Sequence, residues 1–147
     1  MGRYIARISG FYPTDPLECF WCDKYAYVYD PIINTVLKYL LTFNKAKKQA
    51  AYDELLVEIE KCLKVCDSAF RAGKWMIGDG SKIMMCDFFL GRTYADMIAN
   101  PKAFITEKDR SAICAKFPNF KIWGEYFMQE NQGWLKRRAA MGQNFDR

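Results

Sequence analysis

Six cysteines and no histidine limit the chemistry open to this chain of 147 residues. The cysteines form two helically spaced pairs and two single positions: Cys19 and Cys22, Cys62 and Cys66, then Cys86 and Cys114. Two such pairs could bind zinc, but Cys₄ sites usually lie in turns with glycine and polar residues, whereas these pairs lie in apolar, helical surroundings. Without histidine there is no His-assisted nucleophile. We therefore expect no metal site, and reduced core thiols as in a cytoplasmic protein.

Two aspartates are candidates for specific roles. Asp87 follows the turn Gly78-Asp79-Gly80-Ser81 and lies in an apolar run, where the first turn of a helix is expected. A carboxylate at that position accepts backbone N–H groups and interacts favourably with the positive end of the macrodipole, so Asp87 is predicted to hold the helix start. Asp23 follows Cys22 on an earlier helix, where the ordinary interpretation is an exposed carboxylate near Lys24.

The composition is that of one globular domain. Apolar residues make up 51% of the chain and charged residues 27%, with a formal net charge of +5. No apolar run approaches the ~20 residues of a transmembrane helix, and the N-terminus lacks the apolar region of a signal peptide. Lys136-Arg137-Arg138 is a short basic run, and we interpret it as a solvated end of the chain without nucleic acid as a partner.

Apolar residues at helical spacing recur along the chain, which predicts an all-α fold, a helical bundle. The helices that we expect span 15–43 with a kink at Pro31, 49–72, 85–100, 106–116 and 119–133, with a turn at 44–48. The first of these is expected to bury one apolar face, made of Phe20, Tyr27, Val28, Ile32, Val36, Leu40 and Phe43. Trp75 and Trp123 are predicted to anchor the core.

Two motifs resemble a known family. Trp75-Met76-Ile77-Gly78-Asp79, followed by Ile83-Met84-Met85-Cys86-Asp87-Phe88, resembles the core-helix motif of the C-terminal domain of cytosolic glutathione transferases. Phe117-Pro118-Asn119-Phe120-Lys121-Ile122-Trp123 resembles the element that packs against that helix in the family. Where the family has a capping Ser or Thr, three residues before the Asp, this chain has Met84. The resemblance implies a helical bundle of the glutathione transferase C-terminal type.

The resemblance also implies a domain organisation. Residues 1–14 are similar to the end of a helix and the interdomain linker of a glutathione transferase, residues 15–141 to its helical domain, and residues 142–147 form a tail. In the family the thioredoxin-like half precedes this point and carries the catalytic residue, so no catalytic residue is expected here. A separate thioredoxin-like chain is a possible partner.

The family also suggests roles for single residues. The resemblance implies that Asp23 contacts glutathione, a possible co-substrate, with no resident cofactor. It implies that Tyr25, Tyr29 and Ile33 line the pocket for a hydrophobic substrate. An aromatic stripe at helical spacing is more often simply core, so both interpretations of the stripe stay open.

Three functions remain open from the sequence. The chain could supply the electrophile pocket and dimer surface of a glutathione transferase, without catalysis unless a thioredoxin-like half is present. It could be a non-catalytic interaction or scaffold module, or a free-standing helical binder of small apolar ligands. An apolar N-terminal cluster predicts a homo- or hetero-oligomer. Its members are Tyr4, Ile5, Ile8, Phe11 and Tyr12.

Overall fold

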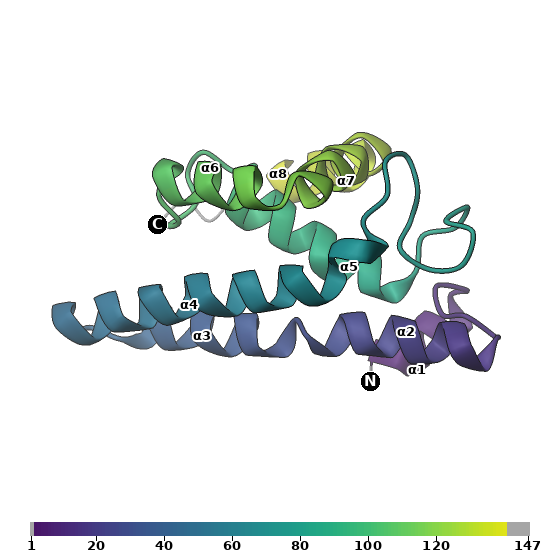
Figure 1. Ribbon diagram of the computed structural model, residues 1–147, viewed down its shortest axis with the longest axis horizontal. Coiled ribbons are helices and arrows are strands. Elements are labelled where there is room, and N and C mark those ends of the chain that lie inside the picture. Colours follow the sequence, from purple (N-terminus) through teal and green to yellow (C-terminus); the bar gives the residue numbers. More distant parts are fainter. Residues whose placement is uncertain (1, 141–147) are drawn as a thin grey trace.

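The computed structural model describes residues 2–140, and the expected tail at residues 142–147 lies outside them. These residues are mostly helical and contain no β-strand, which confirms the all-α class (Figure 1). In chain order the elements are α1 (Gly2–Ile8), α2 (Pro16–Tyr27), α3 (Asp30–Leu41), α4 (Lys45–Cys66), the 3₁₀ turn η1 (Asp67–Ala69), α5 (Met85–Thr93), the π-helical turn η2 (Tyr94–Ile98), α6 (Glu107–Lys116), α7 (Pro118–Glu130) and α8 (Gln132–Ala140).

The helices form two layers with α5 between them (Figure 1). One layer holds α2, α3 and α4, with α3 and α4 running antiparallel, and the other holds α6, α7 and α8. The short helix α1 lies beside α2 and the start of α5, near one end of the first layer. This arrangement places α1, α2 and α5 around a common space.

The first long helix is broken, not merely kinked. It ends at Tyr27 and restarts at Asp30, so that Pro31 lies in the first turn of α3. Proline has no N–H to donate to the carbonyl of Tyr27, and its ring excludes the preceding turn from regular helix geometry. Because the break changes the helical phase, the expected single apolar face is wrong in part. Ile32 and Val36 are buried, whereas Phe20, Tyr27, Leu40 and Phe43 are exposed.

The second long helix begins four residues earlier than the sequence indicated. Asn44, which we expected in a turn, caps α4 by accepting a hydrogen bond from the Lys47 amide at 3.1 Å. The helix ends at Cys66 and tightens into a 3₁₀ turn, instead of continuing to Ala72. Asp15 caps α2, because its Oδ1 accepts hydrogen bonds from the amides of Leu17 and Glu18 at 2.9 Å each.

Aromatic side chains fill the space between the layers. Trp123, Phe120 and Phe127 of α7 are almost completely buried, and Phe70 contacts the first two with ring centroids 5.1–5.2 Å away. Trp75 is also buried, with its ring 4.9 Å from that of Tyr126. Burial of so much aromatic area stabilises the junction between α7 and the segment that leads into α5.

Two glycines allow α5 and α7 to approach closely. A Cβ atom added at Gly91 would lie 2.3 Å from the Phe127 ring, and one added at Gly124 would lie 2.3 Å from the Tyr94 ring. Each helix therefore places an aromatic ring directly on a glycine of the other segment. No side chain larger than hydrogen fits at either position in this arrangement.

Among residues 2–140, no helix is both long enough and apolar enough to span a membrane.

Candidate functional site

The start of α5 is held by Asp87. Its carboxylate is fully buried and accepts hydrogen bonds from the amide of Met84 at 2.8 Å and from the amide of Met76 at 3.0 Å. Met84 itself makes no side-chain cap. Burial raises the pKa of Asp87 to about 6, while the backbone donors act in the opposite direction. Asp87 thus joins the helix start to the segment after Trp75, and its surroundings are those of a structural group.

The turn before α5 is shaped by its glycines. Gly78 has φ +60°, and a Cβ atom there would lie 2.6 Å from Glu18 Oε1. Asp79 accepts a hydrogen bond from the Ser81 amide at 2.9 Å, and this bond lowers the pKa of the exposed Asp79 carboxyl. Both residues therefore form the turn, and neither of them lines the cleft at α1, α2, α3 and α5.

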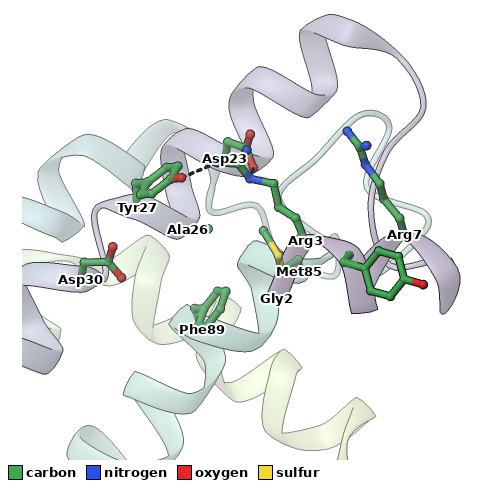
Figure 2. Close-up of a pocket in the computed structure, with 10 residues that line it drawn as sticks. Gly2, Arg3, Arg7, Asp23, Ala26, Tyr27, Asp30, Met85 and Phe89 are labelled. Carbon is green, nitrogen blue, oxygen red and sulfur yellow. Dashed lines mark hydrogen bonds and ion pairs between the residues drawn. The ribbon is translucent and has the colours of Figure 1, made fainter.

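A cleft of about 570 Å³ lies where α1, α2, α3 and α5 meet (Figure 2). Its volume lies in the range of small-molecule sites. The residues that line it are Gly2, Arg3, Tyr4, Arg7, Asp23, Ala26, Tyr27, Asp30, Met85 and Phe89. Two guanidinium groups, two carboxylates and a floor of apolar and aromatic side chains therefore share one space.

Arg3, Asp23 and Tyr27 meet at one side of the cleft (Figure 2). Arg3 Nε lies 3.0 Å from Asp23 Oδ1, and Arg3 Nη2 donates to the Tyr27 hydroxyl. The Arg3 guanidinium also lies 5.3 Å from the centroid of the Tyr27 ring. The Asp23 side chain is about one-quarter exposed, so it lies at the cleft wall and not in bulk solvent. This cluster ties α1 to α2 and orients the carboxylate.

Arg7 adds a second cation to the cleft. It lies one helical turn after Arg3, and its guanidinium is 5.0 Å from the Tyr12 ring. Burial, followed by the neighbouring Asp23 carboxylate, raises the pKa of Tyr12 to about 12, so its phenol stays protonated at neutral pH. Met85 and Phe89 supply the apolar side from α5. The cleft can hold a small molecule that carries both charges and an apolar group.

The other stripe residues lie elsewhere. Tyr25 is buried and lines a separate hollow of about 240 Å³ with Trp21 and Arg71. Tyr29 is buried against Phe89, with ring centroids 5.3 Å apart. Ile33 is partly buried against the core. The structure therefore brings only Asp23 of the sequence-derived binding residues to the large cleft, and Tyr29 contacts it indirectly through Phe89.

The thiols do not form an evident reactive centre. All six cysteines are unpaired by disulfides, and four of them, Cys22, Cys62, Cys66 and Cys86, are buried in the core. Burial and the Cys22 thiol raise the pKa of Cys86, and the Cys62 thiol and burial raise the pKa of Cys66. Within the described residues no three potential ligands are grouped to hold a metal ion. These thiols are core residues.

Sequence reasoning missed most of the cleft. Arg3 and Arg7 are four residues apart, which places them on one face of a helix, and this spacing was the available signal. Nothing local to Tyr27 or Phe89 shows that they meet, because α2 and α5 are brought together only by tertiary packing. A residue's place on a helix can be predicted, but its neighbours from distant segments cannot.

Comparison with known proteins gives no relative from which a role could be transferred. A scan against protein-family models, a search of curated proteins and a search of solved structures each found no match to this chain.

Proposed function

We propose that this chain is a helical domain of the glutathione transferase C-terminal type, and that its cleft binds glutathione or a related thiol peptide and its conjugates. The observation that carries the proposal is the grouping of Arg3, Arg7 and Asp23 beside an apolar wall. Glutathione has two carboxylates and one ammonium group, and a conjugate adds an apolar group at sulfur. Each of these has a complementary group in the cleft.

The fold also supports the resemblance. The first motif that resembles the family, at residues 75–88, contacts the helix in which the second, at residues 117–123, lies. Trp75 packs against Tyr126 and Phe127 of α7, the helix that also carries Trp123. The carboxylate of Asp87 joins both ends of its motif through the Met76 and Met84 amides. A core helix anchored in this way is what the proposed family type requires.

The domain binds but does not activate the thiol in this proposal. None of the described residues that line the cleft is a cysteine or a histidine, and the raised pKa of the adjacent Tyr12 keeps its phenol protonated. Thiol activation would come from a thioredoxin-like domain in the same protein or on a partner chain. The described residues contain no β-sheet, so they do not form such a domain themselves.

Calorimetric titration tests the binding site. We expect S-hexylglutathione to bind the 147-residue chain more tightly than glutathione, because its alkyl group reaches Met85 and Phe89. Asp23→Asn should weaken binding by about tenfold or more, the cost of losing a charge-assisted hydrogen bond to the ligand ammonium. The matched control Asp53→Asn changes a carboxylate on α4 that accepts a hydrogen bond from Gln49 Nε2 and does not line the cleft. Equal affinity in the two variants would refute the site.

The same chain should not conjugate glutathione to 1-chloro-2,4-dinitrobenzene above the uncatalysed rate. The physical reason is that residues 2–140 contain no thioredoxin-like domain to bind and activate the thiol. Turnover clearly above the background rate, lost in Asp23→Asn and retained in Asp53→Asn, would show that the domain is catalytic alone.

A second candidate function is an interaction module. The exposed apolar side chains of α1 favour it, namely Tyr4, Ile5 and Ile8. Tyr12, which we expected in the same cluster, is buried under Arg7, and Phe11 rests edge-on against Phe88 at 5.3 Å. The available surface is therefore smaller than the sequence predicted.

Sedimentation velocity at low micromolar concentration tests the interaction module. We expect a dimer or larger species that dissociates in the Ile5→Glu/Ile8→Glu variant, because a charge on each side chain prevents burial of the patch. The control Val57→Glu alters an exposed apolar side chain on α4. A 17.2 kDa species for the unmodified chain would remove this candidate.

A further inference from the structure

The joined end of α3 and α4 exposes large apolar side chains. Leu37, Leu40, Leu41 and Phe43 are 50%, 43%, 72% and 96% exposed. Figure 1 shows this end of the helix pair projecting beyond the other helices. Among residues 2–140 no helix buries these side chains, and burying a leucine or phenylalanine is favourable whenever a suitable surface is present. We call this end, residues 37–48, the hairpin tip.

The hairpin tip is also uniformly basic. It carries Lys38, Lys45, Lys47 and Lys48, and no acidic residue occurs between Asp30 and Asp53. Lys38 pairs with Glu54 from the next turns of α4. The other three lysines lie in the first turns of α4, which contain no acidic residue. Cations at this end of a helix oppose the macrodipole, so helix stability does not account for them.

A hollow of about 250 Å³ opens beside these lysines. It is lined by Tyr39, Lys45, Lys48, Gln49, Tyr52, Phe104 and Thr106. Tyr39 and Phe104 are stacked with centroids 4.9 Å apart, and Lys48 Nζ lies 4.7 Å from the Tyr39 ring centroid. Two ammonium groups and an amide therefore surround an aromatic floor, a combination suited to an anionic head group.

We propose that the hairpin tip docks on an anionic membrane surface. Leu41 and Phe43 enter the boundary between head groups and acyl chains, while Lys45, Lys47 and Lys48 contact lipid phosphates and carboxylates. Aromatic and apolar side chains favour this boundary, and juxtaposed lysines are attracted to the negative surface. A second copy of the chain is a poorer occupant, because its tip would bring the same positive charges. The interaction is independent of the cleft, because none of the residues that line the cleft belongs to the hairpin tip.

Vesicle co-sedimentation at low and physiological salt tests the proposal. We expect binding to mixed phosphatidylcholine and phosphatidylserine vesicles, at least about tenfold stronger than to phosphatidylcholine alone and weaker at the higher salt. Lys45→Gln/Lys47→Gln/Lys48→Gln should reduce partitioning by roughly a hundredfold, since each lysine near such a surface contributes about fivefold. Leu41→Ser/Phe43→Ser should reduce it by about tenfold or more. The control Leu17→Ser/Phe20→Ser removes exposed apolar side chains at the far end of α2 and should bind normally.

Fluorescence separates insertion from surface attraction. The fluorescence emission of the Phe43→Trp variant should shift to shorter wavelength with the mixed vesicles and be quenched by brominated acyl chains. The emission of the Phe20→Trp variant should not change. Absence of vesicle binding, equal binding to neutral vesicles, or equal losses in the tip and control variants would overturn the proposal. Self-association that requires Leu41 and Phe43 without vesicle binding would assign the hairpin tip to a second copy instead. All substituted side chains are exposed or half-buried, so circular dichroism should confirm that each variant is folded.

Discussion

Asp87→Ala should lower the free energy of unfolding by about 2 kcal/mol at neutral pH, compared with less than about 1 kcal/mol for Asp23→Ala. The first change leaves the Met76 and Met84 amides without their acceptor, and the relief of a buried charge offsets only part of that cost. Asp23 forms a partly exposed ion pair with Arg3, which contributes little. Chemical denaturation of the two variants beside the unmodified chain measures both values. Equal midpoints would contradict a structural role for Asp87.

The loss of stability caused by Asp87→Ala should be larger at acidic pH than at neutral pH. Burial raises the pKa of Asp87 from 3.8 to about 6, so between about pH 4 and pH 6 the folded state binds a proton that the unfolded chain releases. The contribution of Asp87 to the free energy of unfolding is therefore greatest below pH 3.8, its pKa in the unfolded chain. It decreases as the pH rises through about 6, its pKa in the folded state. The difference between the unmodified chain and Asp87→Ala should widen by roughly 2 kcal/mol from pH 7 to pH 4. A narrowing difference would contradict the raised pKa.

Gly91→Ala and Gly124→Ala should each lower the free energy of unfolding by roughly 3 kcal/mol. The added methyl group would overlap the Phe127 ring in one case and the Tyr94 ring in the other. Neither ring can move aside easily, because Phe127 is held by Trp75 and Trp123, and Tyr94 by Phe120. Replacing glycine by alanine gains at most about 1 kcal/mol in helix propensity, which is less than the free-energy cost of this overlap.

Gly133→Ala is the matched control for these glycine variants. It also lies in a helix, but a Cβ atom there would meet nothing closer than Arg137 Nη1 at 3.8 Å, so the change should be neutral or slightly stabilising. The double variant Gly91→Ala/Phe127→Leu should lose less free energy of unfolding than Gly91→Ala and Phe127→Leu lose in total, since the smaller leucine side chain removes the overlap. Thermal denaturation of this series would show whether the two ring-on-glycine contacts limit the approach of α5 and α7.

Helix starts with a capping side chain could be predicted from the sequence. Asp15 and Thr106 cap α2 and α6 at the positions where the helices expected at 15–43 and 106–116 begin, because a cap is a contact between residues two or three positions apart. The same local chemistry at Asn44 was overlooked, since the lysines after it looked like a polar turn. The all-α class followed from helical spacing, which does not depend on tertiary contacts.

The buried faces of the helices and the residues of the cleft were harder to predict than the helix starts. Phe20 was expected in the core because a continuous helix was extended through Pro31, where the structure has a break. Phe43 was expected on the same helix, but α3 ends at Leu41 and Phe43 lies exposed in the connection to α4. The cleft depends on α1 lying against α2, which brings Arg3 to Asp23 from 20 positions away along the chain. Such a pairing is determined by the packing of whole helices and has no signature in the local sequence.

The break at Val28 and Tyr29 has a dynamic consequence. On one side of it α2 rests on α5, and on the other side α3 rests on α4, so we expect the two parts of this helical element to open separately. Partial unfolding that starts at the far end of α3 and α4 exposes their amides to hydrogen exchange and can stop at the break. The arrangement of α1, α2 and α5 is then retained while the other unit opens and closes.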